Sequence, residues 1–200
     1  MVTRSHEKIQ KLTTIALLAA LTVLLQVVCT FIKFGPVSLT LALTPIIIGA
    51  ALYGWQTGAL LGFVFSFTVY VMGITGADGG FVLMMMEYNA FATTLVCLLK
   101  GTAAGAAAGA VYKLLFRKNK TVAALTASML APLVNTGLFA LVMATVFYGF
   151  LSGMASGASS DPLPFLFTGM IGINFIVEFA VNTALGTTVA RILAIYRKNH

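Results

Sequence analysis

Hydrophobic residues along the chain form long runs, which are separated by short segments that contain glycine, proline or charged residues. A helix needs roughly 20 predominantly apolar residues to cross a bilayer. Between residues 39 and 72 the apolar stretch is too long for one span, and the segment Tyr53-Gly54-Trp55-Gln56 divides it into two short helices with a tight turn. The pattern therefore predicts six transmembrane helices, at about residues 12–31, 39–53, 55–72, 90–116, 122–150 and 165–195.

The composition places this pattern in an all-α integral membrane protein with a single transmembrane domain over residues 1–200. Hydrophobic residues make up 60% of the sequence and charged residues 8%, whereas a soluble domain carries about 25% charged residues. The first run extends past the ~7–15 apolar residues of a signal peptide and lacks a clear cleavage site, so we expect a retained first helix. Cys29 and Cys97 lie in apolar runs without a CxxC or Cys/His pattern, so we expect no disulfide framework, metal or cofactor.

The basic residues indicate how the helices are oriented in the membrane. A formal net charge of +7 could suggest a nucleic-acid partner, but the lysines and arginines gather at helix ends, as membrane anchors do. With six spans, one side of the membrane receives Arg4, Lys8, Lys11, the segment 117–120, Arg191, Arg197 and Lys198. The other side receives Lys33, Asp78, Glu87 and Asp161. The positive-inside rule therefore predicts cytoplasmic termini (N-in, C-in), and we expect no nucleic acid as a partner.

Two ionisable residues are predicted to lie deep in the membrane. The last run carries Asn174, Glu178 and Asn182 at i, i+4 and i+8, which places them on one helix face. Lys100 in the fourth run lies at a comparable depth, roughly 15 Å from the outer end against roughly 20 Å for Glu178. Because a charge inside a membrane needs a partner, two hypotheses remain open. Either these residues form a pocket for a small solute, with Lys100 available for a ligand carboxylate, or a Lys100–Glu178 ion pair only holds two helices together.

Other polar positions are candidates for the same pocket. Asn135 and Asn174 either contact a ligand or form interhelical hydrogen bonds, and for Asn182 we expect the interhelical bond. Tyr88 and Asn89 end a methionine-rich segment that enters the fourth helix from outside, and methionine-rich surfaces adapt to apolar ligands. The alternative for this segment is a packed or lipid-facing helix start.

The sequence contains no catalytic constellation. His6 and His200 lie near the ends of the chain and the few carboxylates are scattered, so an enzyme is the least favoured class. No GxxxxGK[ST] motif is present, so the chain cannot itself hydrolyse ATP and needs a partner or an ion gradient if it drives transport. Ala16 and Ala20 form a small face on the first helix, which either packs within the monomer or docks another membrane subunit.

A series of short motifs resembles a known family in order and spacing. They are Ala16-x-x-x-Ala20, Phe34-Gly35-Pro36-Val37-Ser38-Leu39, Ile46 to Ala50, Tyr53-Gly54 with Gly58, Ala59 and Gly62, Lys100-Gly101 with Ala104-Gly105, Asn135-Thr136, and Asn174-x-x-x-Glu178. Over nearly its whole length the chain is similar to the substrate-binding S components of energy-coupling factor (ECF) vitamin transporters.

This resemblance implies a six-helix subunit of the bacterial plasma membrane that binds a vitamin with high affinity from outside. Its implied partners are a transmembrane scaffold subunit, on which Ala16 and Ala20 dock, and two cytoplasmic ATPases. Lys100, Asn135, Asn174 and Glu178 are the implied pocket residues, and the segment 33–38 is the implied lid, with Phe34 touching the substrate. The pantothenate- and folate-type branch looks closest, and pantothenate is the favoured example, while lipoate, a folate or an uncharged vitamin stay open. The competing hypothesis is a membrane structural or assembly protein.

Overall fold

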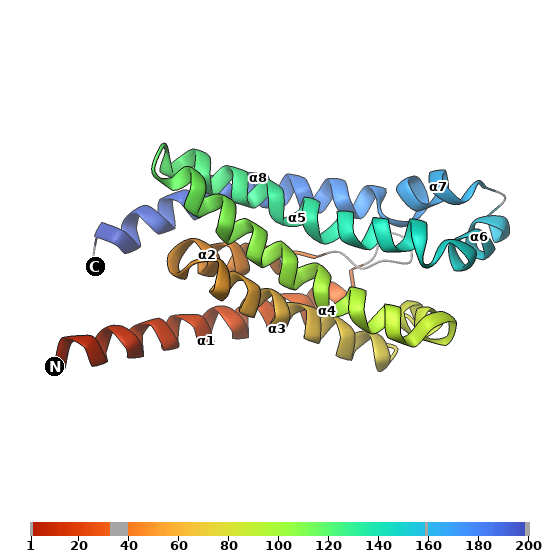
Figure 1. The fold of residues 1–200 in the computed structure, drawn as a ribbon, viewed down its shortest axis with the longest axis horizontal. Coiled ribbons are helices and arrows are strands. Elements are labelled where there is room, and N and C mark those ends of the chain that lie inside the picture. The colour runs from red at the N-terminus through yellow and green to blue at the C-terminus, as the bar shows by residue number, and fades with distance from the viewer. Residues whose placement is uncertain (1, 33–39, 159, 199–200) are drawn as a thin grey trace.

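The computed structural model describes residues 2–32, 40–158 and 160–198, and these residues form a helical bundle (Figure 1). Five of the described helices are long and apolar enough to cross a membrane, namely α1, α3, α4, α5 and α8, and α2 is a shorter apolar helix. The elements are α1 (Val2–Thr30), α2 (Leu43–Tyr53), α3 (Trp55–Ile74), α4 (Phe81–Phe116), α5 (Lys120–Thr145), α6 (Tyr148–Gly157), α7 (Pro162–Pro164), the π-helix η1 (Phe165–Met170) and α8 (Gly172–Lys198). The predicted all-α membrane bundle is confirmed.

Several helix boundaries differ from the hydropathy pattern. Helix α4 begins at Phe81, and the start predicted at residue 90 corresponds to a break inside it, where Asn89 has extended backbone angles (φ −157°, ψ 94°). The apolar run predicted as one helix over 122–150 is divided near Phe147 into α5 and α6. The run predicted over 165–195 begins with η1, and α8 starts at Gly172, where a side chain would collide with the Phe167 carbonyl oxygen. Hydrophobicity continues through these breaks, so it does not mark them.

The glycine stripes of α3 and α4 bring two helix backbones into contact. A Cβ atom added to Gly58 would overlap the Gly105 carbonyl oxygen, and one added to Gly62 would overlap that of Gly101. Small residues permit this approach because no side chain separates the two helices. The Gly101 N–H also donates a hydrogen bond to Ser66 Oγ at 3.1 Å, which fixes the register of α4 just beside Lys100.

The short helix α2 lies inside the bundle. Its residues Leu43, Ile46 and Ile47 are at most 1% exposed and belong to a core with contributions from α1, α3, α4, α5 and α8. A second core lies toward the other end of the molecule and is rich in phenylalanine and methionine from α4, α5, α6 and η1. The cavity described below is lined partly by this second core.

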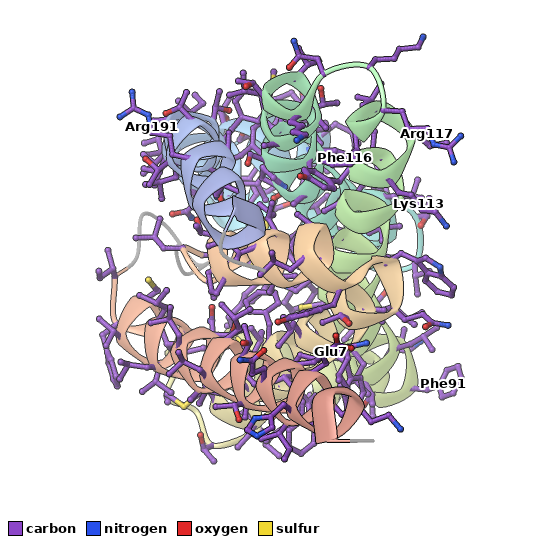
Figure 2. All side chains as sticks on the ribbon, turned by 90° about the vertical axis from the view of Figure 1, so that its left-hand side faces the viewer. Glu7, Phe91, Lys113, Phe116, Arg117 and Arg191 are labelled. Atoms are coloured by element: carbon purple, nitrogen blue, oxygen red, sulfur yellow. The ribbon has the colours of Figure 1, made fainter. Side chains whose placement is uncertain are left out.

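Both chain ends lie at the same end of the bundle, as the predicted N-in, C-in topology requires (Figure 1). The connection between α4 and α5 lies there too. Figure 2 looks onto this end, where Lys113 and Arg117 project at the end of α4 and Arg191 projects from α8. Basic residues therefore mark this end as the cytoplasmic one.

Candidate substrate-binding cavity

Helices α1, α3, α4, α5 and α8 surround a cavity of about 70 Å³. Polar and charged side chains share its wall with aromatic rings, methionines and other apolar residues. The lining residues are Gln26, Thr30, Thr40, Val69, Met72, Asp78, Phe81, Val82, Met85, Val96, Cys97, Lys100, Asn135, Thr136, Phe139, Ile171, Asn174, Phe175 and Glu178.

Four polar residues that were predicted from the sequence meet at this cavity. Lys100 comes from α4, Asn135 from α5, and Asn174 and Glu178 from successive turns of α8. Asn135, Asn174 and Glu178 are each 4% exposed, and Lys100 is half-buried. The i, i+4 spacing on α8 therefore directs two polar groups into one space, as expected for residues on the same helix face.

The Lys100 ammonium group lies over an aromatic ring. Its Nζ atom is 5.3 Å from the centroid of Phe139, within the range of a cation–π interaction. In the part of the chain that the structure describes, no ion pair within 4.0 Å joins Lys100 to Glu178. The direct ion pair of the helix-holding hypothesis is therefore absent between these two residues.

Some buried acceptor atoms of the cavity have no hydrogen-bond partner. Among the described residues these include Gln26 Oε1, Asn135 Oδ1 and Glu178 Oε1. Buried polar groups in proteins are nearly always hydrogen-bonded, and an unsatisfied one costs about 1–3 kcal/mol. A cavity whose lining residues carry several such atoms is suited to a ligand that supplies the missing partners.

Comparison with known proteins agrees with this arrangement. The family described as the ECF transporter substrate-specific component matches residues 10–197, which is nearly the whole chain. The chain belongs to this family. Comparison with curated proteins and with solved structures gives no match. An S component is a multi-pass transport subunit of the cell membrane rather than an enzyme, and it works with an energy-coupling module.

Two predicted substrate contacts of this S component, Tyr88 and Asn89, are not among the described residues that line the cavity. Tyr88 is 51% exposed, and its ring packs against Phe147 and Phe150 at centroid distances of 5.7 and 5.8 Å. The Asn89 side chain accepts a hydrogen bond from the Ala92 N–H at 3.0 Å and so caps the part of α4 that follows the break. Phe34 lies outside the described residues.

Asn182 connects helices of the S component, as its position predicted. Its Nδ2 atom donates to the Glu178 carbonyl oxygen at 2.8 Å, and the Thr44 hydroxyl group donates to its Oδ1 atom at 3.2 Å. Both ends of the amide are therefore used, one within α8 and one toward α2, and Asn182 does not line the cavity.

The sequence analysis missed several lining residues of the S component. Gln26 is the clearest, because a single amide in the apolar first run is a visible signal, and it is 3% exposed. Asp78 lies in a glycine-rich connection that gave no such signal, and its oxygens accept hydrogen bonds from the Gly80 and Val82 N–H groups, both at 2.9 Å. Cys97 lies one turn of α4 before Lys100, and both line the cavity.

Ala16 and Ala20 lie on the outside of the bundle. Both are exposed, and the neighbouring Leu17, Leu21 and Leu24 are exposed as well. This face of α1 does not pack against the described part of the chain, which disagrees with the hypothesis that it packs within the monomer.

Proposed function

We propose that this S component captures a small vitamin-like solute from outside the cell with high affinity. Lys100, Asn135, Asn174 and Glu178 are the proposed binding residues. The observation that carries the proposal is the convergence of buried polar side chains from α1, α5 and α8 on one cavity, with acceptor atoms that have no partner among the described residues.

The cavity lies in the half of the bundle away from the basic end. Thr30 is the last residue of α1 and Phe81 is the first residue of α4, and both line it. The basic residues Lys113 and Arg117 are at the opposite end of α4. This position supports loading from the exterior, and the segment 33–38, with Phe34, is the proposed lid.

Release inside the cell requires energy that this chain does not generate. No ATP-binding motif is present in the sequence. We place the docking surface for the transmembrane scaffold on the exposed face of α1 around Ala16 and Ala20, where small residues allow a second helix to approach closely. Two cytoplasmic ATPase subunits would then drive the scaffold.

The identity of the substrate is the most specific claim of the proposal. We favour the pantothenate- and folate-type branch, with pantothenate as its example, on the assumption that the Lys100 ammonium group binds a ligand carboxylate. Lys100 makes no ion pair with Glu178 in the described structure, which leaves its ammonium group available for a ligand carboxylate. Lipoate, folates and uncharged vitamins complete the set of candidates.

A thermal-stability screen of the purified full-length chain against B vitamins and related acids tests the function. A ligand at a thousandfold excess over its Kd stabilises the folded protein by about 4 kcal/mol through mass action. We expect at least one compound to raise the apparent melting temperature and to be imported when the energy-coupling module is present. If the chain is only a structural protein, no compound will stabilise it and uptake will not depend on it.

A further inference from the structure

Three buried acceptor atoms belong to residues that line the cavity from three different helices. Gln26 Oε1, Asn135 Oδ1 and Glu178 Oε1 have no hydrogen-bond partner among the described residues, and their side chains are 3–4% exposed. The orientation of Gln26 is fixed by its own nitrogen, which donates to Thr30 Oγ1 at 3.3 Å. Its carbonyl oxygen is therefore the atom that is left for a ligand. Acceptors of this kind are satisfied only by N–H or O–H groups.

The charged residues that line the cavity also favour a ligand that donates hydrogen bonds. Lys100 is the one cation among the described lining residues, and Glu178 and Asp78 are the carboxylates. Because both Asp78 oxygens accept backbone hydrogen bonds, Glu178 is the carboxylate with a free acceptor. A carboxylate on a ligand would be the third carboxylate in a described lining that holds one cation.

The apolar part of the wall indicates the shape of the ligand. Phe81, Phe139 and Phe175 supply ring faces and edges, and Met72 and Met85 supply adaptable thioethers. A volume of about 70 Å³ has room for on the order of five water molecules. This space suits one substituted ring better than a long or fused-ring acid.

We propose that the ligand is a neutral or cationic molecule, about the size of one substituted ring, that presents at least two N–H or O–H donors to Gln26, Asn135 and Glu178. This inference rests on the proposed binding function and specifies its substrate class. Within the set of candidates named above, it favours uncharged or cationic vitamins over carboxylic acids, because the described lining already holds two carboxylates and a single ammonium group.

Matched ligand pairs test the class directly. The full-length chain in detergent is titrated by calorimetry with pyridoxamine and 4-pyridoxate, and with nicotinamide and nicotinate, which differ mainly in a donor group against a carboxylate. We expect the donor member of at least one pair to bind at least tenfold more tightly than its carboxylate partner. Equal or tighter binding of the carboxylate members overturns the ligand class but leaves the binding function standing. If none of the four compounds binds and no compound of the vitamin screen binds, both the ligand class and the binding function are overturned.

Substitution of Gln26 by leucine separates a ligand contact from a structural role. Loss of one neutral hydrogen bond should weaken binding of the donor compound by roughly 2- to 12-fold, while the melting temperature of the free protein stays the same or rises, because an unsatisfied atom is removed. Asn182→Leu is the control, since both ends of that amide are bonded and it lies outside the cavity. It should lower the melting temperature and keep the donor preference. A Gln26→Leu protein that melts earlier and binds as before would overturn the assignment.

Discussion

Replacing Glu178 by glutamine distinguishes a carboxylate that binds ligand from one that supports the fold. The substitution keeps the size and shape of the side chain and removes only the ability to carry charge. Glu178 is 4% exposed, its Oε1 atom has no partner among the described residues, and it makes no ion pair with Lys100 there. Few contacts in the folded protein therefore depend on the charge.

The expected effects on stability and on binding have opposite signs. Desolvation of a buried ion costs several kcal/mol, and no ion pair within 4.0 Å offsets this cost for Glu178 among the described residues. The free energy of unfolding should therefore stay the same or rise by up to about 2 kcal/mol. A hydrogen bond to a charged group contributes about 1.5–3 kcal/mol and one to a neutral group about 0.5–1.5 kcal/mol. Binding should therefore weaken by about 1–2 kcal/mol, or roughly 5- to 30-fold, with the largest loss for a cationic ligand.

The assay combines a calorimetric titration with the melting temperature of the ligand-free protein. Glu87→Gln is the matched control, because it makes the same chemical change at an exposed residue of α4 that does not line the cavity. Glu87→Gln should change neither the ligand affinity nor the melting temperature. A Glu178→Gln protein that melts several degrees lower and binds its ligand as before would refute the reasoning and favour the hypothesis that this carboxylate only holds helices together.

Three further changes test the docking face, the helix packing and a helix cap. Ala16→Trp should leave ligand affinity unchanged, because the residue is exposed, but should abolish uptake by the assembled transporter; continued uptake would move the docking face elsewhere. Gly62→Ala should destabilise by about 1–3 kcal/mol, because its methyl group meets the Gly101 carbonyl oxygen. The same change at Gly137, which has open space around it, should stabilise by about 0.5–1 kcal/mol; equal melting shifts would contradict this packing. Asn119→Ala should lower stability by about 1 kcal/mol, since its side chain accepts from the Thr121 and Val122 N–H groups; an unchanged melting temperature would show that this cap is dispensable.

The bundle could be predicted from the sequence because its main determinant is local. Apolar run length sets the number of spans, and glycine at every fourth position makes close packing possible wherever the partner helix lies. The contact of Gly58 and Gly62 with α4 backbone atoms follows from that spacing. The same periodicity put Asn174 and Glu178 on one face of α8, which is why this part of the cavity was found from the sequence.

The rest of the cavity depends on tertiary packing, which periodicity does not reveal. Tyr88 and Asn89 follow a methionine-rich segment that resembles a binding surface, but the break at Asn89 uses that side chain as a cap, and Tyr88 packs on aromatic rings instead. Gln26 reaches the site only because α1 packs against α2 and α3. Asp78 reaches it only because its connection folds over the start of α4. The direction of a single polar side chain in a run is set by such crossings.

The unsatisfied acceptors connect the stability of the free protein to the affinity for its ligand. Three of them, at about 1–3 kcal/mol each, leave the free protein roughly 3–9 kcal/mol less stable than a fully bonded bundle would be. A ligand that meets all three recovers this free energy on binding. A nanomolar Kd corresponds to about 12 kcal/mol, and association also carries an entropic cost, so polar contacts alone are insufficient. The apolar wall around Phe139 and Met85 must supply the remainder. An S component with this cavity should therefore reject a hydrophilic donor that lacks a ring, even though it satisfies every acceptor.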